Sequence, residues 1–198
     1  MKRWLFIALL IHSFGVLVYR WDWPMVGLHG FRETQTAMTA YWFGPMFDYQ
    51  TPLMGPPWTI PFELPLMQWV TWLVWHLGVP LDAAGRVVSW SFGMLVLLPL
   101  GRISAKLTID SYAACILYMA SPIYLFWTTS FLIDSTALFL AMMFLMYAME
   151  ERWPAMMLFG VLAALVKLPT LVPFAFCAVS FGLTGPITAR PATRSAPC

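Results

Sequence analysis

The sequence predicts an all-α membrane protein with about six transmembrane helices and two juxtamembrane helices in its first outer loop. Of its 198 residues, 61% are hydrophobic and only 10% are charged, whereas about 25% of residues in a soluble domain are charged. The mean hydropathy is +0.74. Apolar runs of near-membrane length recur along the chain, and no basic run indicates nucleic acid as a partner.

The first predicted element is an anchor helix at the N-terminus. Lys2 and Arg3 precede an apolar run, as in a signal peptide, but the run ends at Tyr19, Arg20 and Trp21 without a small-residue cleavage site. An aromatic and arginine belt is typical of the end of a membrane span, so we expect an uncleaved helix. Six apolar segments could cross a bilayer, most of them slightly shorter than the ~20 residues of a straight span. They are 4–20, 86–101, 111–128, 132–149, 154–167 and 169–184.

A seventh apolar stretch, 65–78, decides the predicted topology. It has 14 residues with three tryptophans, which favours a helix at the membrane surface. If it lies there and the N-terminus is inside, seven of the 11 Lys and Arg residues are cytoplasmic and four are outside. If it crosses, the ratio inverts. The positive-inside rule favours the first arrangement. We therefore expect a protein of a bacterial inner membrane with both termini in the cytoplasm.

The loop between the first two predicted spans, residues 21–85, collects polar side chains at the outer face. It is rich in Trp, Phe, Met and Pro, unlike a disordered segment. RETQTAMTAYWF can form a short amphipathic helix, whereas DYQTPLMGPPWTIPFELP, broken by prolines, must be extended or turning. We expect a transmembrane region over 1–184 and a disordered cytoplasmic tail over 185–198. The acids predicted at the outer face are Asp22, Glu33, Asp48, Glu63, Asp82 and Asp134.

Five sequence blocks follow one another in a recognisable order: GFRETQTAMTAYWF, FDYQTPLMGPPWTIPFELPLMQWVTWLVWHLGV, AAGRVVSW, SPIYLFWTTSFLIDSTALFLA and GVLAALVKLPTLVPF. Together they resemble the membrane glycosyltransferases of the GT-C class, the relatives of protein O-mannosyltransferases and of the lipid A aminoarabinose transferase. The first two blocks resemble the family's acidic motif with its first juxtamembrane helix and the entry into the second. The other three resemble the start of helix two, the start of helix four and the turn between helices five and six. The resemblance runs from Lys2 to Phe176.

The resemblance implies glycosyl transfer at the outer face. In that family, a sugar moves from a polyprenyl-phosphate carrier to an acceptor, and an acid in the first outer loop is the proposed general base. Arg32 departs from the pattern, because it stands where the usual Asp-Glu motif has its Asp. The chain also ends after six predicted spans, so we expect an incomplete enzyme. The expected partners are membrane lipid, the sugar donor, an unidentified acceptor and a second chain that completes the bundle.

This chemistry needs a base for the acceptor proton and cations for the departing phosphate. Glu33 and Asp134 are the candidate catalytic residues. Each also has a plain structural interpretation, Glu33 as a first-turn helix acid and Asp134 as a helix cap. The candidate substrate- and phosphate-binding residues are Arg32, Arg86, Lys167, Asp48 and Glu63.

Several alternatives stay open at this point. Lys167 could snorkel to the headgroups, and Arg32 could pair with Glu33 and hold it ionised. No cofactor is expected, and a metal site is not indicated, because His29 and His76 have no companions at ligand spacing. A non-catalytic membrane scaffold for lipid binding or assembly is the second hypothesis for the whole chain. A small transporter, the third, would need charges within mid-span positions.

Overall fold

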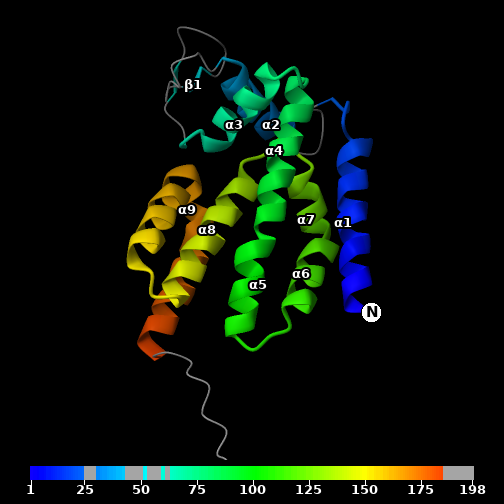
Figure 1. Cartoon of the computed structure of the whole chain (residues 1–198). Coiled ribbons are helices and arrows are strands. Elements are labelled where there is room, and N and C mark those ends of the chain that lie inside the picture. Colours follow the sequence, from blue (N-terminus) through cyan, green and yellow to red (C-terminus); the bar gives the residue numbers. More distant parts are fainter. Residues whose placement is uncertain (25–29, 43–50, 53–58, 61–62, 185–198) are drawn as a thin grey trace, which may run out of the picture.

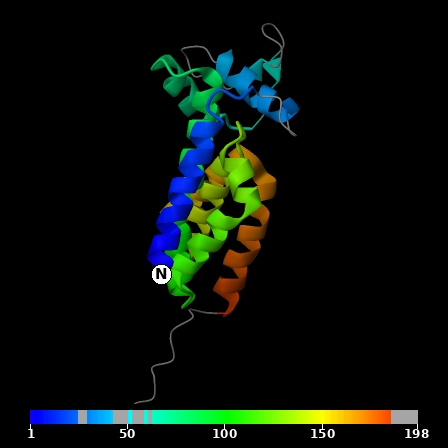
Figure 2. The ribbon, with the colours of Figure 1, turned by 90° about the vertical axis from the view of Figure 1, so that its right-hand side faces the viewer.

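The computed structural model describes residues 1–24, 30–42, 51–52, 59–60 and 63–184. These ranges form a helical bundle with a cap of two helices and a short strand pair at one end (Figure 1 and Figure 2). The N-terminus lies at the end away from the cap (Figure 1). The elements are α1 (Lys2–Tyr19), α2 (Gly30–Tyr41), β1 (Thr51–Pro52), β2 (Thr59–Ile60), α3 (Leu66–His76), α4 (Leu81–Leu95), α5 (Leu97–Lys106), α6 (Ser111–Ala120), α7 (Pro122–Thr128), α8 (Asp134–Met149) and α9 (Trp153–Thr184).

Among the described residues, three helical stretches are long and apolar enough to cross a membrane. They are Lys2–Tyr19, Leu81–Lys106 and Trp153–Phe181. Two shorter apolar helices are Ser111–Ala120 and Asp134–Met149. These helices support a membrane protein, whereas the count of six spans goes beyond them and stays a prediction.

Prolines divide two of the predicted spans. The segment predicted at 86–101 extends over α4 and α5, which are interrupted at Val96. Pro99, three residues on, has no amide hydrogen to continue the helical ladder. The segment predicted at 111–128 is two helices joined at Ser121, which has an extended backbone (φ −68°, ψ 129°). Pro122 disfavours a helical backbone at the residue before it and occupies the first position of α7.

Helix α9 folds back on itself at Lys167, whose backbone is extended (φ −165°, ψ 89°). Before Lys167, α9 runs antiparallel to α8, since Phe159 stacks on Tyr147 near the end of α8. After Lys167 it returns along α8, and Phe181 packs in the cluster around Met146. The predicted segments 154–167 and 169–184 therefore lie on either side of one turn at the capped end (Figure 1 and Figure 2).

The cap contains the two helices that the sequence predicts in the first outer loop. Helix α2 covers most of RETQTAMTAYWF, and α3 lies within the predicted stretch 65–78. Ala37 and Ala40 of α2 pack with Met67 of α3, Val88 of α4 and Phe131. Strands β1 and β2 pair antiparallel inside the proline-rich stretch, where the sequence predicts an extended or turning chain. The predicted tail, 185–198, lies outside the described residues.

Helix α4 approaches the end of α7 and the segment after it very closely. An added Cβ on Gly85 would lie 2.2 Å from the ring of Phe131, and one on Gly93 would lie 2.2 Å from Thr128 Cγ2. Ser89, one turn beyond Gly85, donates to the Trp127 carbonyl at 3.0 Å. These contacts position the residues that lead into α8.

Polar contacts join α1 to the bundle along its length. The hydroxyls of Ser13 and Tyr124 lie 2.7 Å apart, and Trp90 Nε1 donates to Ser13 Oγ at 2.9 Å. At the other end of α1, Lys2 forms an ion pair with Asp110, which caps α6 by accepting from the Ala113 amide at 3.1 Å. The first helix is thus fixed to α4, α6 and α7.

The close approach at Gly85 predicts a specific loss of stability. Gly85→Ala should lower the free energy of unfolding by about 1–3 kcal/mol, because the buried Phe131 ring must move. Gly101→Ala in α5 is the matched control, since its added Cβ meets no described heavy atom within 4 Å. Alanine is favoured over glycine in a helix by about 1 kcal/mol, so the control should be neutral or stabilised. Unfolding of both variants in the same nanodiscs measures the difference, and equal stabilities would contradict the packing.

Candidate functional site

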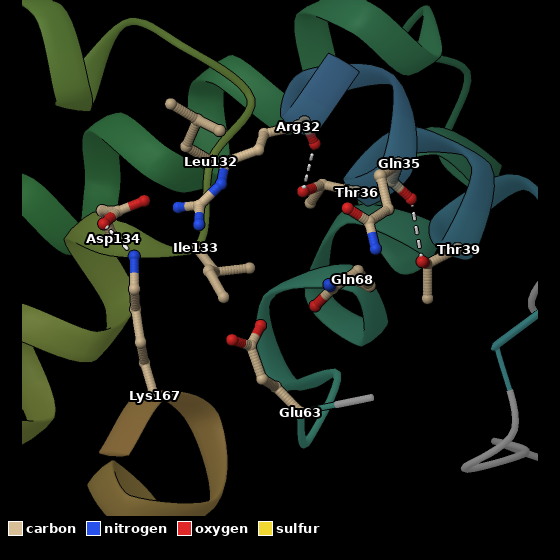
Figure 3. Close-up of a pocket in the computed structure, with 10 residues that line it drawn as sticks. All are labelled: Arg32, Gln35, Thr36, Thr39, Glu63, Gln68, Leu132, Ile133, Asp134 and Lys167. Atoms are coloured by element: carbon tan, nitrogen blue, oxygen red, sulfur yellow. Dashed lines mark hydrogen bonds and ion pairs between the residues drawn. The ribbon is translucent and has the colours of Figure 1, made fainter. Parts of the chain in front are cut away.

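A polar pocket lies where the cap meets the turn of α9 and the start of α8 (Figure 3). Its volume is about 130 Å³. Cap helices α2 and α3 form one wall, and the ends of α8 and of the first half of α9 form the other. The lining residues are Arg32, Gln35, Thr36, Thr39, Glu63, Gln68, Leu132, Ile133, Asp134 and Lys167.

An ion pair between Lys167 Nζ and Asp134 Oδ1 forms one side of the pocket. Asp134 is the first residue of α8 and Ile133 is its cap, so the predicted capping role of Asp134 is not what the structure has. Lys167 stands at the turn of α9, two residues before Pro169. Their side chains are only 15% and 21% exposed, so each charge compensates the other where solvation is poor. Lys167 therefore faces Asp134 rather than extending to bulk water.

Arg32 brings a second cation to the pocket from the first turn of α2. Its guanidinium extends toward the side formed by Leu132 and Asp134 (Figure 3). Within the described ranges it forms no ion pair with a carboxylate, including its neighbour Glu33. Its backbone carbonyl accepts from Thr36 Oγ1 at 2.9 Å. The planar donor fork of Arg32 is thus available to an anionic ligand.

Glu63 enters the pocket from the residues just before α3. The next amide, that of Leu64, donates to the Leu165 carbonyl at 2.8 Å, which fixes this stretch to the turn of α9. The Glu63 carboxyl extends toward the cations (Figure 3). Glu63 is exposed on one side, but its partial burial raises its pKa, the charges of Lys167 and Arg32 oppose that rise, and the charge of Asp134 adds to it. The result is a carboxylate more basic than a solvated glutamate.

Glu33 takes a different direction from α2 and does not line the pocket. It is 2% exposed, and it is one of the acids near enough to act electrostatically on the Arg86 guanidinium. Adjacent residues of a helix point about 100° apart, because a turn has 3.6 residues. Arg32 can therefore face the pocket while Glu33 is buried beneath the cap. Of the two candidate catalytic residues, Asp134 thus lines the pocket and Glu33 does not.

Arg86 is a structural anchor in this structure and does not line the pocket. It is 1% exposed and lies in α4, near the carbonyls that follow α1. Its guanidinium donates to the carbonyls of Arg20 at 3.0 Å and Trp21 at 3.4 Å, and also to that of Trp23. These bonds come from the two terminal nitrogens and use three of the five N–H donors, whereas the buried Nε has no partner among the described residues. In this structure Arg86 thus clamps residues 20–23, and its predicted phosphate-binding role stays a prediction.

Four polar lining residues were not predicted from the sequence: Gln35, Thr36, Thr39 and Gln68. The three on α2 follow Arg32 at spacings of three, four and seven, which places all four on one helical face. That spacing could have indicated a shared polar surface. Gln68 offers no comparable signal, because it is a single amide within an apolar helix.

Asp48, the last of the predicted site residues, lies outside the described residues. In the part of the chain that the structure describes, no three His, Cys, Asp or Glu side chains could hold a metal ion together. No family model, curated protein or solved structure matches the chain.

The anchoring role of Arg86 predicts that its loss affects the ligand-free protein. Arg86→Met should lower the free energy of unfolding by about 3 kcal/mol, because three backbone carbonyls and Glu33 lose a buried charged partner. Arg102→Met, on the exposed surface of α5, should change it by less than about 0.5 kcal/mol. Denaturant unfolding in mixed micelles without donor lipid measures both. Unchanged stability in Arg86→Met would contradict the anchoring role.

Proposed function

We propose that the chain is a glycosyltransferase-like protein that moves a sugar from a polyprenyl-phosphate donor to an acceptor at the outer face of a bacterial inner membrane. The observation that carries this proposal is one pocket lined by two cations, Arg32 and Lys167, and two acids, Glu63 and Asp134. All four stand in sequence blocks that resemble the GT-C class. As in that class, the pocket lies beneath two short helices next to the bundle.

The proposed topology places this pocket near the lipid headgroups. Both termini are cytoplasmic, and six spans cross the membrane: α1, α4 with α5, α6 with α7, α8 and each half of α9. The cap then lies on the outer surface, with the tryptophan-rich α3 in the interfacial region where such residues concentrate. A polyprenyl chain would remain in the bilayer while its phosphate reaches Lys167 and Arg32.

The reaction follows from the charges in the pocket. The acceptor oxygen forms a bond to the anomeric carbon of the sugar, and the bond from that carbon to the phosphate oxygen breaks. The electron pair of the broken bond stays on the phosphate, where Lys167 and Arg32 stabilise the negative charge. The acceptor proton passes to a carboxylate, which becomes a carboxylic acid.

Glu63 is the best candidate for that proton acceptor. Its pKa is raised by burial, and among the described residues no cation forms an ion pair with it. Asp134 is already paired with Lys167, so it acts first as the group that positions this cation. We do not propose Glu33 as the proton acceptor, because it is buried and does not line the pocket.

A scaffold that binds the lipid phosphate without turnover is the competing function. It is favoured by Arg32, whose guanidinium occupies the pocket at the sequence position where the family has an acid (Figure 3). A scaffold would bind donor lipid through Lys167 and Arg32 but would have no use for an ionised Glu63. Binding and turnover measured on the same variants therefore separate the two functions.

Removal of the Glu63 charge should abolish transfer while leaving binding. Glu63→Gln is expected to reduce turnover by about 10²–10⁴-fold, the usual contribution of a positioned base. Release of polyprenyl phosphate from a polyprenyl-phosphate hexose measures turnover whatever the acceptor is. The membranes should come from cells that make the full chain, so that any second chain is present. Glu151→Gln, at an exposed position beyond α8, is the matched control and should retain full activity.

Two outcomes would contradict this assignment. If Glu63→Gln stays active, Glu63 is not the proton acceptor. If the unaltered chain binds the donor and releases no polyprenyl phosphate in any of these membranes, it is a scaffold.

The pH dependence of transfer should shift in opposite directions in two variants. Glu63 must be ionised to accept a proton, so the rate falls as the pH falls through its raised pKa. The charge of Arg32 lowers that pKa, so Arg32→Gln should move the acidic limb of the profile to higher pH. The charge of Asp134 raises it, so Asp134→Asn should move the limb to lower pH. Rate–pH profiles at saturating donor measure these shifts. Lys106→Gln, at the other end of the bundle, is the control and should leave the profile unshifted. If the acidic limbs of Arg32→Gln and Asp134→Asn moved in the same direction, Glu63 would be excluded as the titrating group.

A further inference from the structure

The pocket has two chemically distinct halves. Arg32, Glu63, Asp134 and Lys167 form the charged half, beside the turn of α9 (Figure 3). Gln35, Thr36 and Thr39 of α2 and Gln68 of α3 form the neutral half. The neutral half contains amides and hydroxyls with no ionisable group, so it needs a ligand with different chemistry.

The neutral half has oxygen atoms with acceptor capacity that no described residue is recorded as using. The hydroxyls of Thr36 and Thr39 donate to the carbonyls of Arg32 and Gln35, both at 2.9 Å. A hydroxyl has one hydrogen but two acceptor lone pairs, so both oxygens can still accept. Gln68 is only 8% exposed, and its Oε1 has no hydrogen-bond partner among the described residues. A buried acceptor without a donor is unfavourable, which makes a hydroxyl-bearing ligand the natural complement.

We propose that the neutral half is a subsite for an uncharged sugar and that Gln68 determines its specificity. This inference rests on the proposed function and adds the substrate class: the donor carries a neutral hexose or pentose. Sugar hydroxyls donate to the oxygens of Thr36, Thr39 and Gln68, and they accept from the amide nitrogens of Gln35 and Gln68. The last torsion of a glutamine side chain rotates readily, so Gln68 Oε1 can turn toward the sugar.

The same geometry rejects a charged sugar. A carboxylate or ammonium placed against the neutral half would lose its hydration without gaining a counter-charge. The cations of the charged half are engaged by the donor phosphate, and Asp134 is paired with Lys167. The Glu63 carboxylate also lies in the charged half, where the charges of Lys167 and Arg32 act on it, and not in the neutral half. A donor with a uronic acid or an amino sugar should therefore bind more weakly than one with a neutral hexose.

The test compares four lipids that carry the same phosphodiester charge. The full chain in nanodiscs is titrated with a polyprenyl-phosphate hexose, with its uronic acid and amino-sugar counterparts, and with methyl polyprenyl phosphate, which has no sugar. The unaltered chain should bind the hexose donor about tenfold more tightly than the methyl diester, the effect of one or two good hydrogen bonds. Gln68→Leu should lose this preference and keep its affinity for the methyl diester.

Thr71→Val is the matched control. Thr71 lies on the same helix, is fully buried and has an unpartnered Oγ1 among the described residues, but it does not line the pocket. Its loss should leave the preference for the hexose donor intact. Gln35→Leu, at a partly exposed position on α2, should weaken the same preference and provides a second readout if Gln68→Leu does not fold.

The outcomes separate this inference from the function on which it rests. Equal affinity of the unaltered chain for the hexose donor and the methyl diester would overturn the sugar subsite and leave lipid-phosphate binding in place. Tighter binding of a charged-sugar donor would overturn the neutral specificity. Failure to bind any of the four lipids would overturn the proposed function together with the subsite.

Discussion

The ion pair between Lys167 and Asp134 joins the two structural features on which the pocket depends. Asp134 begins α8, and Lys167 is the extended residue at which α9 reverses along α8. Without a counter-charge, a mostly buried lysine at such a turn would be drawn toward water. The pair therefore fixes a cation at the side of the pocket. The Leu64 amide, bonded to the Leu165 carbonyl, connects the cap to the same turn.

The rotation of α2 explains how a short polar helix both packs against the bundle and lines the pocket. Ala37 and Ala40 are small enough to let α2 approach α3 and α4 closely. The same rotation buries Glu33 near Arg86 and turns Arg32, Gln35 and Thr39 toward the pocket. Glu33 and Arg32, although adjacent in the chain, thus lie in separate environments. Glu33 contributes to the buried charges under the cap, and Arg32 contributes to the site.

The sequence predicts the parts of this structure that depend on local pattern. Apolar runs locate the helices, and the tryptophan-rich stretch 65–78 is the short helix α3. Four of the seven predicted site residues, Arg32, Glu63, Asp134 and Lys167, line one pocket. Arg86 could not be interpreted in the same way, because its partners are carbonyls 63 to 66 positions earlier in the chain. Residue type indicates a cation there, but only the packing of α4 against the end of α1 decides what that cation binds.

The charge balance of the pocket gives the proposed reaction a further rationale. With both acids ionised, Arg32 and Lys167 are matched by Glu63 and Asp134. The donor is a phosphodiester with one negative charge, whereas the departing polyprenyl phosphate approaches two. When Glu63 takes the acceptor proton, the pocket loses one negative charge as the phosphate gains one. The total charge between the cap and the turn of α9 therefore stays constant during transfer, and little reorganisation of the surrounding groups is needed. An arginine in place of Glu63 could also bind the phosphate but could not make this exchange, so in the proposed reaction a carboxylate at position 63 connects binding to chemistry.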